Sequence, residues 1–95
     1  MPRARKARKK AESVIPKETL AKEIARIVDD GGLTQTEAAE LLDDAASQVS
    51  LVVNGRVAGF SPERLMRMLT GLGRDVDIVI RRARRRSGKV RVTVR

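Results

Sequence analysis

The chain has 95 residues, a formal net charge of +9, no Cys and no His. Without these two residue types it lacks the commonest general base, the usual zinc ligands and the cysteine nucleophile. We therefore predict that it is not an enzyme and that it holds no metal and no cofactor.

The length and the apolar content support one domain with a modest core. Dimerisation is the usual additional source of stability for such a domain, so we expect a homodimer. No apolar run approaches the roughly eighteen residues of a membrane span, which predicts no membrane partner. The absence of Cys is compatible with a reducing cytoplasm, where we expect the protein.

The positive charge is concentrated in two segments. Residues 1–10 carry six basic side chains and residues 81–95 carry eight, and neither segment has an acidic one. The middle, residues 11–80, holds seven basic side chains and all twelve acidic ones. Clustered cations without carboxylates are typical of proteins that bind polyanions, because each neutralised phosphate releases counterions. The alternative is that both basic segments are merely solvated.

Apolar residues at helical spacing predict three helices in the first part of the domain. The first begins at Pro16 and ends at Gly31 and Gly32, since glycine adopts the left-handed conformation that terminates helices. The second begins with a capping box, Thr34–Glu37. The third runs from about Ala45 to Val53, after Asp43 and Asp44, which end one helix and cap the next. The positions predicted to face the core are Leu20, Ile24, Ile27, Val28, Ala38, Ala39, Leu41, Leu42, Val49, Val52 and Val53.

The next segment predicts a further helix and then a change of period. Ser61 as cap, Pro62 at the first helical position and Phe60 placed to pack on Leu65 indicate a helix that ends at Gly73. Beyond it, apolar residues alternate over 76–80 and again over 90–94, which predicts two strands separated by an arginine-rich stretch. Because a lone two-stranded hairpin is marginal in water, we expect these strands to pack on the helices or to pair with a second copy.

These elements define the expected fold class and domain organisation. We predict a mainly α protein, a compact bundle of four to five short helices with a helix-turn-helix, followed by one or two C-terminal β-strands. Residues 1–15 are expected to form a basic, flexible N-terminal arm, and residues 16–73 the helix-turn-helix domain. Residues 74–95 are expected to form a basic strand segment that is a candidate dimer contact.

The stretch from Gln35 to Val52, QTEAAELLDDAASQVSLV, resembles the helix-turn-helix of the Cro-like, XRE-type regulators. The small Ala39 lets two helices approach, while apolar residues such as Leu42 and Val49 hold the second helix against the first. The sequence that follows, NGRVAGFSPERLMRMLTGLGRDVDIVI, is similar to the subgroup that includes HigA-like antitoxins. The resemblance covers roughly residues 17–80.

The resemblance implies a function and a set of contact residues. The helix from Ala45 would lie in the major groove of double-stranded DNA, and the protein would dimerise on a palindromic operator. For antitoxin members, a RelE/HigB-like ribonuclease toxin would be a partner. Gln48 is long enough for a bidentate contact, most naturally to adenine. The implied DNA contacts are Gln35 and Thr36 at the phosphates, Ala45, Ala46, Ser47, Gln48 and Ser50 at base edges, and Asn54 and Arg56 at the nearby backbone.

The turn of this motif departs from the family pattern, because Asp43 and Asp44 stand where a Gly and an apolar residue are usual. Two carboxylates beside the groove would repel phosphate, so we expect affinity to depend also on the basic segments, on DNA shape and on dimerisation. Arg56 and Arg64 are either DNA contacts or solvated arginines. The acidic pairs of the chain are better explained as caps and turns than as metal ligands.

Two functions of different classes fit the sequence. One is an autoregulating transcription repressor that reads duplex DNA; the other is an antitoxin that acts mainly by binding a toxin, for which the acidic middle suits a basic ribonuclease. A third is a nonspecific basic nucleic-acid binder. Phe60 is the only aromatic residue, so the chain lacks platforms for stacking single-stranded bases, which favours duplex DNA over RNA.

Overall fold

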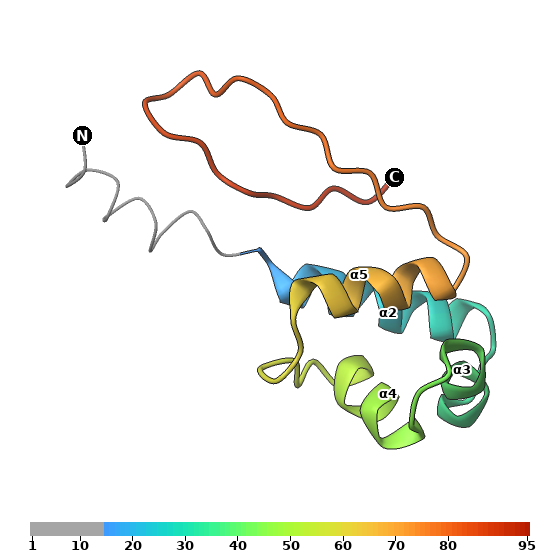
Figure 1. Ribbon diagram of the computed structural model, residues 1–95. Helices are drawn as coiled ribbons and strands as arrows, with labels where there is room; N and C mark the ends of the chain where they lie inside the picture. The colour runs from blue at the N-terminus through green and yellow to red at the C-terminus, as the bar shows by residue number, and fades with distance from the viewer. Residues whose placement is uncertain (1–14) are drawn as a thin grey trace.

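The computed structural model describes residues 15–95, which form four helices followed by an open loop (Figure 1). The helices are α2 (Lys17–Asp30), α3 (Gln35–Leu42), α4 (Ala46–Val53) and α5 (Pro62–Gly71). The helix α2 packs against α5 and α4, and α3 packs against α4. The predicted N-terminal arm lies outside the described residues except for Ile15, which contacts the core. Within 15–95, no helix is long and apolar enough to cross a membrane.

The first of these helices, α2, confirms the predicted amphipathic helix. No side chain caps its start at Pro16. Instead, Lys17 Nζ donates a hydrogen bond to the carbonyl oxygen of Phe60 at 3.0 Å, which joins the start of α2 to the segment before α5. At the other end Gly32 has φ +65°, a conformation that other residues rarely adopt. The buried residues of α2 are Leu20, Ala21, Ile24, Ile27 and Val28.

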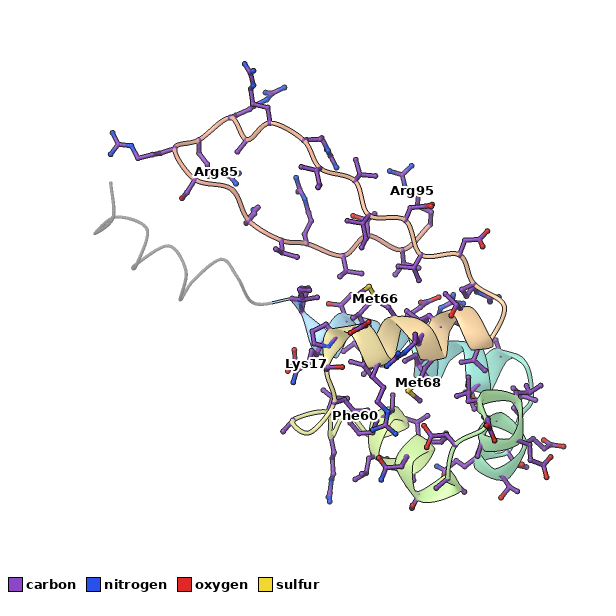
Figure 2. The ribbon with its side chains drawn as sticks, viewed as in Figure 1. Lys17, Phe60, Met66, Met68, Arg85 and Arg95 are labelled. Carbon is purple, nitrogen blue, oxygen red and sulfur yellow. The ribbon has the colours of Figure 1, made fainter. Side chains whose placement is uncertain are left out.

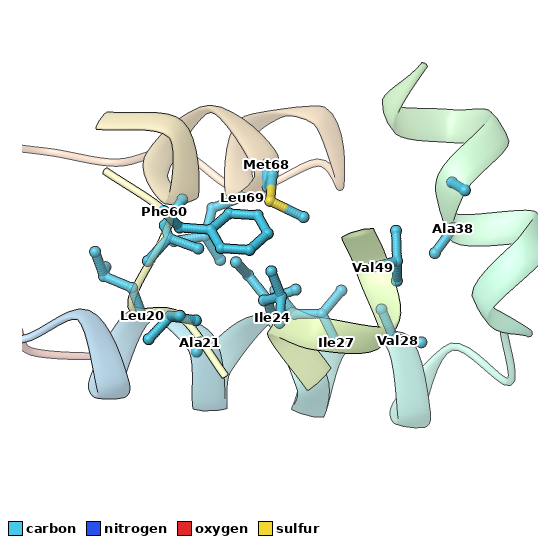
Figure 3. Packing of buried hydrophobic residues seen from close by; sticks show 14 residues of the cluster. Leu20, Ala21, Ile24, Ile27, Val28, Ala38, Val49, Phe60, Met68 and Leu69 are labelled. Atoms are coloured by element: carbon cyan, nitrogen blue, oxygen red, sulfur yellow. The ribbon is translucent and has the colours of Figure 1, made fainter. Parts of the chain in front are cut away.

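The hydrophobic core lies where α2, α4 and α5 meet, and Figure 3 shows its packing. Leu65 and Ile24 are among its fully buried side chains, and each such side chain contributes about 1.5–3 kcal/mol. Phe60 is only 4% exposed and lies between α5 and α2. One core assignment is wrong: Leu41 is 60% exposed. The short helix α3 buries only the small residues Ala38 and Ala39, and position 41 lies at the edge of that face.

The helix α5 begins as the sequence predicts. The Ser61 side chain accepts a hydrogen bond from the backbone N–H of Arg64 at 3.1 Å, and Pro62 occupies the first turn. The helix ends at Gly71 rather than Gly73, and Gly73 follows in the next turn with φ +90°. Its buried face consists of Leu65, Met68 and Leu69.

The predicted C-terminal β-strands are wrong, since the structure assigns no strand anywhere in residues 15–95. Residues 74–95 form instead an open loop on the side of α2 and α5 away from α3 and α4, with Arg85 near its far end (Figures 1 and 2). Only Val76 and Val92 of this loop pack against the core, whereas Ile80 is 92% exposed. Alternating apolar residues give a segment one apolar face, but they do not supply a second strand to hydrogen-bond with it. The five arginines between the two segments also disfavour a tight hairpin, because their like charges repel one another.

Candidate nucleic-acid interface

The helices α3 and α4 and the turn between them form the helix-turn-helix of the chain. The predicted capping box at its start is confirmed: the Thr34 hydroxyl accepts the Glu37 N–H at 3.0 Å, and the Glu37 carboxylate accepts the Thr34 N–H at 2.9 Å. These reciprocal bonds satisfy two of the free donors at the helix start. They fix where α3 begins and therefore where Gln35 and Thr36 lie, in its exposed first turn.

The turn itself explains one departure from the family pattern. Asp43 has φ 53° and ψ 48°, the left-handed conformation in which helices commonly end with Gly. Its side chain is exposed, and no side-chain hydrogen bond or ion pair is formed by it in the described part of the chain. The helix α3 thus ends in the usual geometry with an unusual residue, and a carboxylate stands beside the start of α4.

The second carboxylate of the turn, Asp44, has a different role from the predicted helix cap. The residue that caps α4 is Ala45, and it has no side-chain cap, so α4 begins one residue later than expected. Asp44 Oδ1 accepts the backbone N–H of Ala45 at 2.8 Å. The guanidinium of Arg64, on α5, donates to both oxygens of Asp44, at 3.0 Å and 3.3 Å. The negative charge of Asp44 is therefore balanced by Arg64 within the fold.

The environment of Asp44 shifts its acidity. Burial of the carboxyl raises its pKa, but the Ala45 N–H and the Arg64 guanidinium outweigh burial, so this pKa lies below its ordinary value. The Arg64 guanidinium also lies 4.5 Å from the centre of the Phe60 ring. The sequence patterns do not predict this contact, because Asp44 and Arg64 are twenty positions apart and no local pattern connects them.

The implied contact residues differ in exposure. Gln35, Thr36, Ala45, Ser47, Asn54 and Arg56 are exposed, whereas Ala46, Gln48 and Ser50 are half-buried. The first turn of α4 brings Ala46, Ser47 and Gln48 together. Ala46 packs against the core, so it contributes little surface for reading bases. The Asn54 side chain donates to the Ser50 carbonyl at 2.8 Å, and it therefore caps the end of α4.

Two members of the acidic pairs, Asp30 and Asp44, form ion pairs with arginines within the fold. Asp30 pairs with Arg26 at 2.8 Å at the end of α2. Arg26 also pairs with Glu23, which raises the pKa of the guanidinium above its ordinary value. Among the described residues no three His, Cys, Asp or Glu side chains gather where they could hold a metal ion.

Comparison of the chain with known proteins identifies its family. The sequence profile of a family described as a helix-turn-helix domain matches residues 7–81. A solved structure that is named as an XRE-family transcriptional regulator is 38% identical to the chain, with a TM-score of 0.70, and the match covers 80% of this chain and 85% of the other. The chain belongs to the XRE-type helix-turn-helix family. Among curated proteins the comparison found no match. The likeness of this XRE-type protein to HigA-like antitoxins stays a prediction.

Proposed function

We propose that this XRE-type protein is a transcription regulator that binds double-stranded DNA in a sequence-specific way, with α4 in the major groove. Its membership of the helix-turn-helix family carries the proposal, because in that motif the second helix enters the groove. The position of Phe60 also supports a duplex target. The only aromatic side chain is 4% exposed and belongs to the core, so no aromatic surface is left for stacking bases.

The first turn of α4 would read the operator. Ser47 is exposed, and Gln48 has the length and the two amide groups needed for a bidentate contact to adenine. Gln35 and Thr36, in the exposed first turn of α3, would hold a phosphate. Asn54 would contribute less than its exposure indicates, because its amide already bonds to the end of α4.

The test is binding of the purified chain to its own upstream promoter DNA and to a scrambled duplex of equal length, at two salt concentrations. We expect a preference for the promoter that survives the higher salt. Gln48→Ala should reduce that preference by about tenfold, since a good bidentate contact is worth about 1–3 kcal/mol. Arg67→Ala, which removes an exposed side chain of α5, is the control. Equal binding to both duplexes, lost with salt, would leave only nonspecific contacts of the basic segments.

We further propose that the protein is a homodimer in which residues 74–95 contact the second copy. Ile78, Val79 and Ile80 are 74%, 71% and 92% exposed, an apolar surface that association would remove from water. The loop lies on the side of α2 and α5 away from α4, so a partner bound there leaves α4 free for DNA (Figure 1). A palindromic operator would be read if the two-fold axis of this dimer sets both copies of α4 on one face of the DNA, about 34 Å apart.

The dimer contact is tested by sedimentation equilibrium of the double variant Ile78→Asp and Ile80→Asp. We expect this variant to be a monomer at concentrations where the wild-type chain is a dimer. Leu41→Asp changes another exposed apolar residue, on α3, and should remain a dimer. If only Leu41→Asp dissociates, the contact lies on α3 instead.

A repressor that regulates its own gene as the antitoxin of a toxin–antitoxin pair is the finer form of this proposal. The charge of the middle segment favours it, since residues 11–80 hold twelve acidic and seven basic side chains and would complement a basic ribonuclease of the RelE/HigB-like kind. The test is co-expression with the product of the adjacent gene. An adjacent gene that encodes no small basic protein, together with no stable complex, would remove the antitoxin role and leave the regulator.

A further inference from the structure

The turn of the helix-turn-helix is tied to α5 by three side chains, Asp44, Arg64 and Phe60, which we call the turn cluster. Asp44 accepts the Ala45 N–H at 2.8 Å, and Arg64 donates to its two oxygens at 3.0 Å and 3.3 Å. One carboxylate therefore bridges the residue that caps α4 and a side chain from another helix. Of these three side chains, only Asp44 bonds to both the start of α4 and a residue of α5.

Arg64 is held from several sides. Its own backbone N–H donates to the Ser61 side chain at 3.1 Å, which places it in the capped first turn of α5. Its guanidinium lies 4.5 Å from the centre of the Phe60 ring, at a distance where a cation and an aromatic face attract. Phe60 is buried in the core. A side chain fixed in this way is a firm anchor for the carboxylate that it binds.

The turn cluster also changes the charge beside α4. Asp43 and Asp44 both lie in the turn before α4, but only Asp43 is exposed, and its side chain has no hydrogen-bond or ion-pair partner among the described residues, whereas Asp44 pairs with Arg64. The side chain of Asp44 is 21% exposed and that of Arg64 35%, so the pair is partly removed from solvent, where charges interact more strongly than at an open surface. Without Arg64, the Asp44 carboxylate would be left unpaired next to the first turn of α4.

We propose that Arg64 is a positioning residue for DNA recognition: it holds Asp44, and through Asp44 the start of α4, and it cancels the charge of that carboxylate. This role rests on the proposed function of α4 as the reading helix. It differs from that of an arginine that binds a phosphate directly, because Nη2 of Arg64 is bonded to Asp44 and the guanidinium lies over the Phe60 ring.

The first test measures promoter and scrambled-duplex binding of Arg64→Gln, Asp44→Asn and the double variant. Arg64→Gln should weaken promoter binding by about tenfold, the usual size of effect when one partner of a charged hydrogen bond is removed. Asp44→Asn keeps the acceptor for the Ala45 N–H but removes the charge, so the double variant should recover most of the affinity. Arg67→Gln removes the same charge from an exposed position on α5 and should change binding less than Arg64→Gln does.

The rescue separates positioning from direct contact. If Arg64 bound a phosphate instead of Asp44, Asp44→Asn would change binding by the same factor with and without Arg64→Gln, so the two effects would be additive. The salt dependence of Arg64→Gln would also fall by about one counterion. That outcome would overturn the proposal. Arg64→Lys is a second check, because it keeps the charge but not the two bonds to Asp44, and it should bind between wild type and Arg64→Gln.

A second measurement needs no DNA. Amide chemical shifts of Arg64→Gln should move at Ala45, Ala46 and Ser47, with thermal unfolding showing that the variant is folded. Unchanged shifts there in a folded variant would refute the coupling between Arg64 and α4, whatever the DNA result. The chemical shifts could move while the wild-type chain binds scrambled DNA as well as it binds the promoter. That combination would refute the proposed function, and with it the role of Arg64 in DNA recognition.

Discussion

Replacement of Asp43 by Gly should raise both stability and DNA affinity. Asp43 ends α3 with φ 53°, and the left-handed conformation costs an L-residue about 1–2 kcal/mol, with Asp at the low end of that range. Gly removes this strain but loses about 0.5–1 kcal/mol through the greater freedom of the unfolded chain. The net gain in unfolding free energy should be up to about 0.5 kcal/mol, which corresponds to a rise of up to about 4 °C in the midpoint of thermal unfolding for a domain of this size. Differential scanning calorimetry measures it directly.

The control for this substitution is Asp43→Ala, which removes the same carboxylate but keeps a Cβ in the left-handed conformation. Both variants should bind promoter DNA more tightly than wild type at low salt, because both remove a negative charge beside α4. Only the Gly variant should be more stable than wild type. A Gly variant less stable than wild type would refute the strain argument, and unchanged affinity in both variants would show that the Asp43 carboxylate does not approach the DNA.

Two further predictions concern the same motif. Thr34→Ala removes one half of the capping box and should lower the unfolding free energy in urea by about 0.5–2 kcal/mol, while Thr36→Ala, in the same exposed turn, should change it little. Asp44 has a lower pKa in the folded chain than its ordinary value of 3.8, so its stabilising effect is present above that value and is lost as the pH falls through the folded pKa. Acid titrations of unfolding free energy should therefore be flatter for Asp44→Asn than for wild type, and equal slopes would contradict the assignment.

The helices could be predicted because their signals are local. The Thr34–Glu37 box and the Ser61–Pro62 start each act within a single turn, and the structure contains both. The end of α3 at Asp43 also follows from the sequence, whereas the left-handed conformation of Asp43 comes from the structure alone. The helix boundaries differ from the predicted ones by one or two residues, at the start of α4 and the end of α5, because neighbouring residues compete for the same cap.

The features that sequence analysis predicted wrongly, or did not predict, depend on residues distant in the sequence. Alternating apolar residues predict strands only if another strand supplies the hydrogen bonds, and no strand is found in residues 15–95. The bond between Asp44 and Arg64 arises because α5 folds back over the turn, an arrangement that no spacing rule encodes. The contact residues of α3 and α4 stay a prediction, since exposure alone does not identify a DNA contact.

The attachment of the C-terminal loop by only Val76 and Val92 has a consequence for how the protein can evolve. Substitutions elsewhere in that loop touch few core side chains and should change stability little, so the loop can accumulate mutations while the helices stay intact. If this loop is the dimer contact that we propose, paralogues could keep one helix-turn-helix domain and diverge in the segment that selects the second copy. Related regulators in one cell would then avoid forming mixed assemblies without any change to the helix-turn-helix.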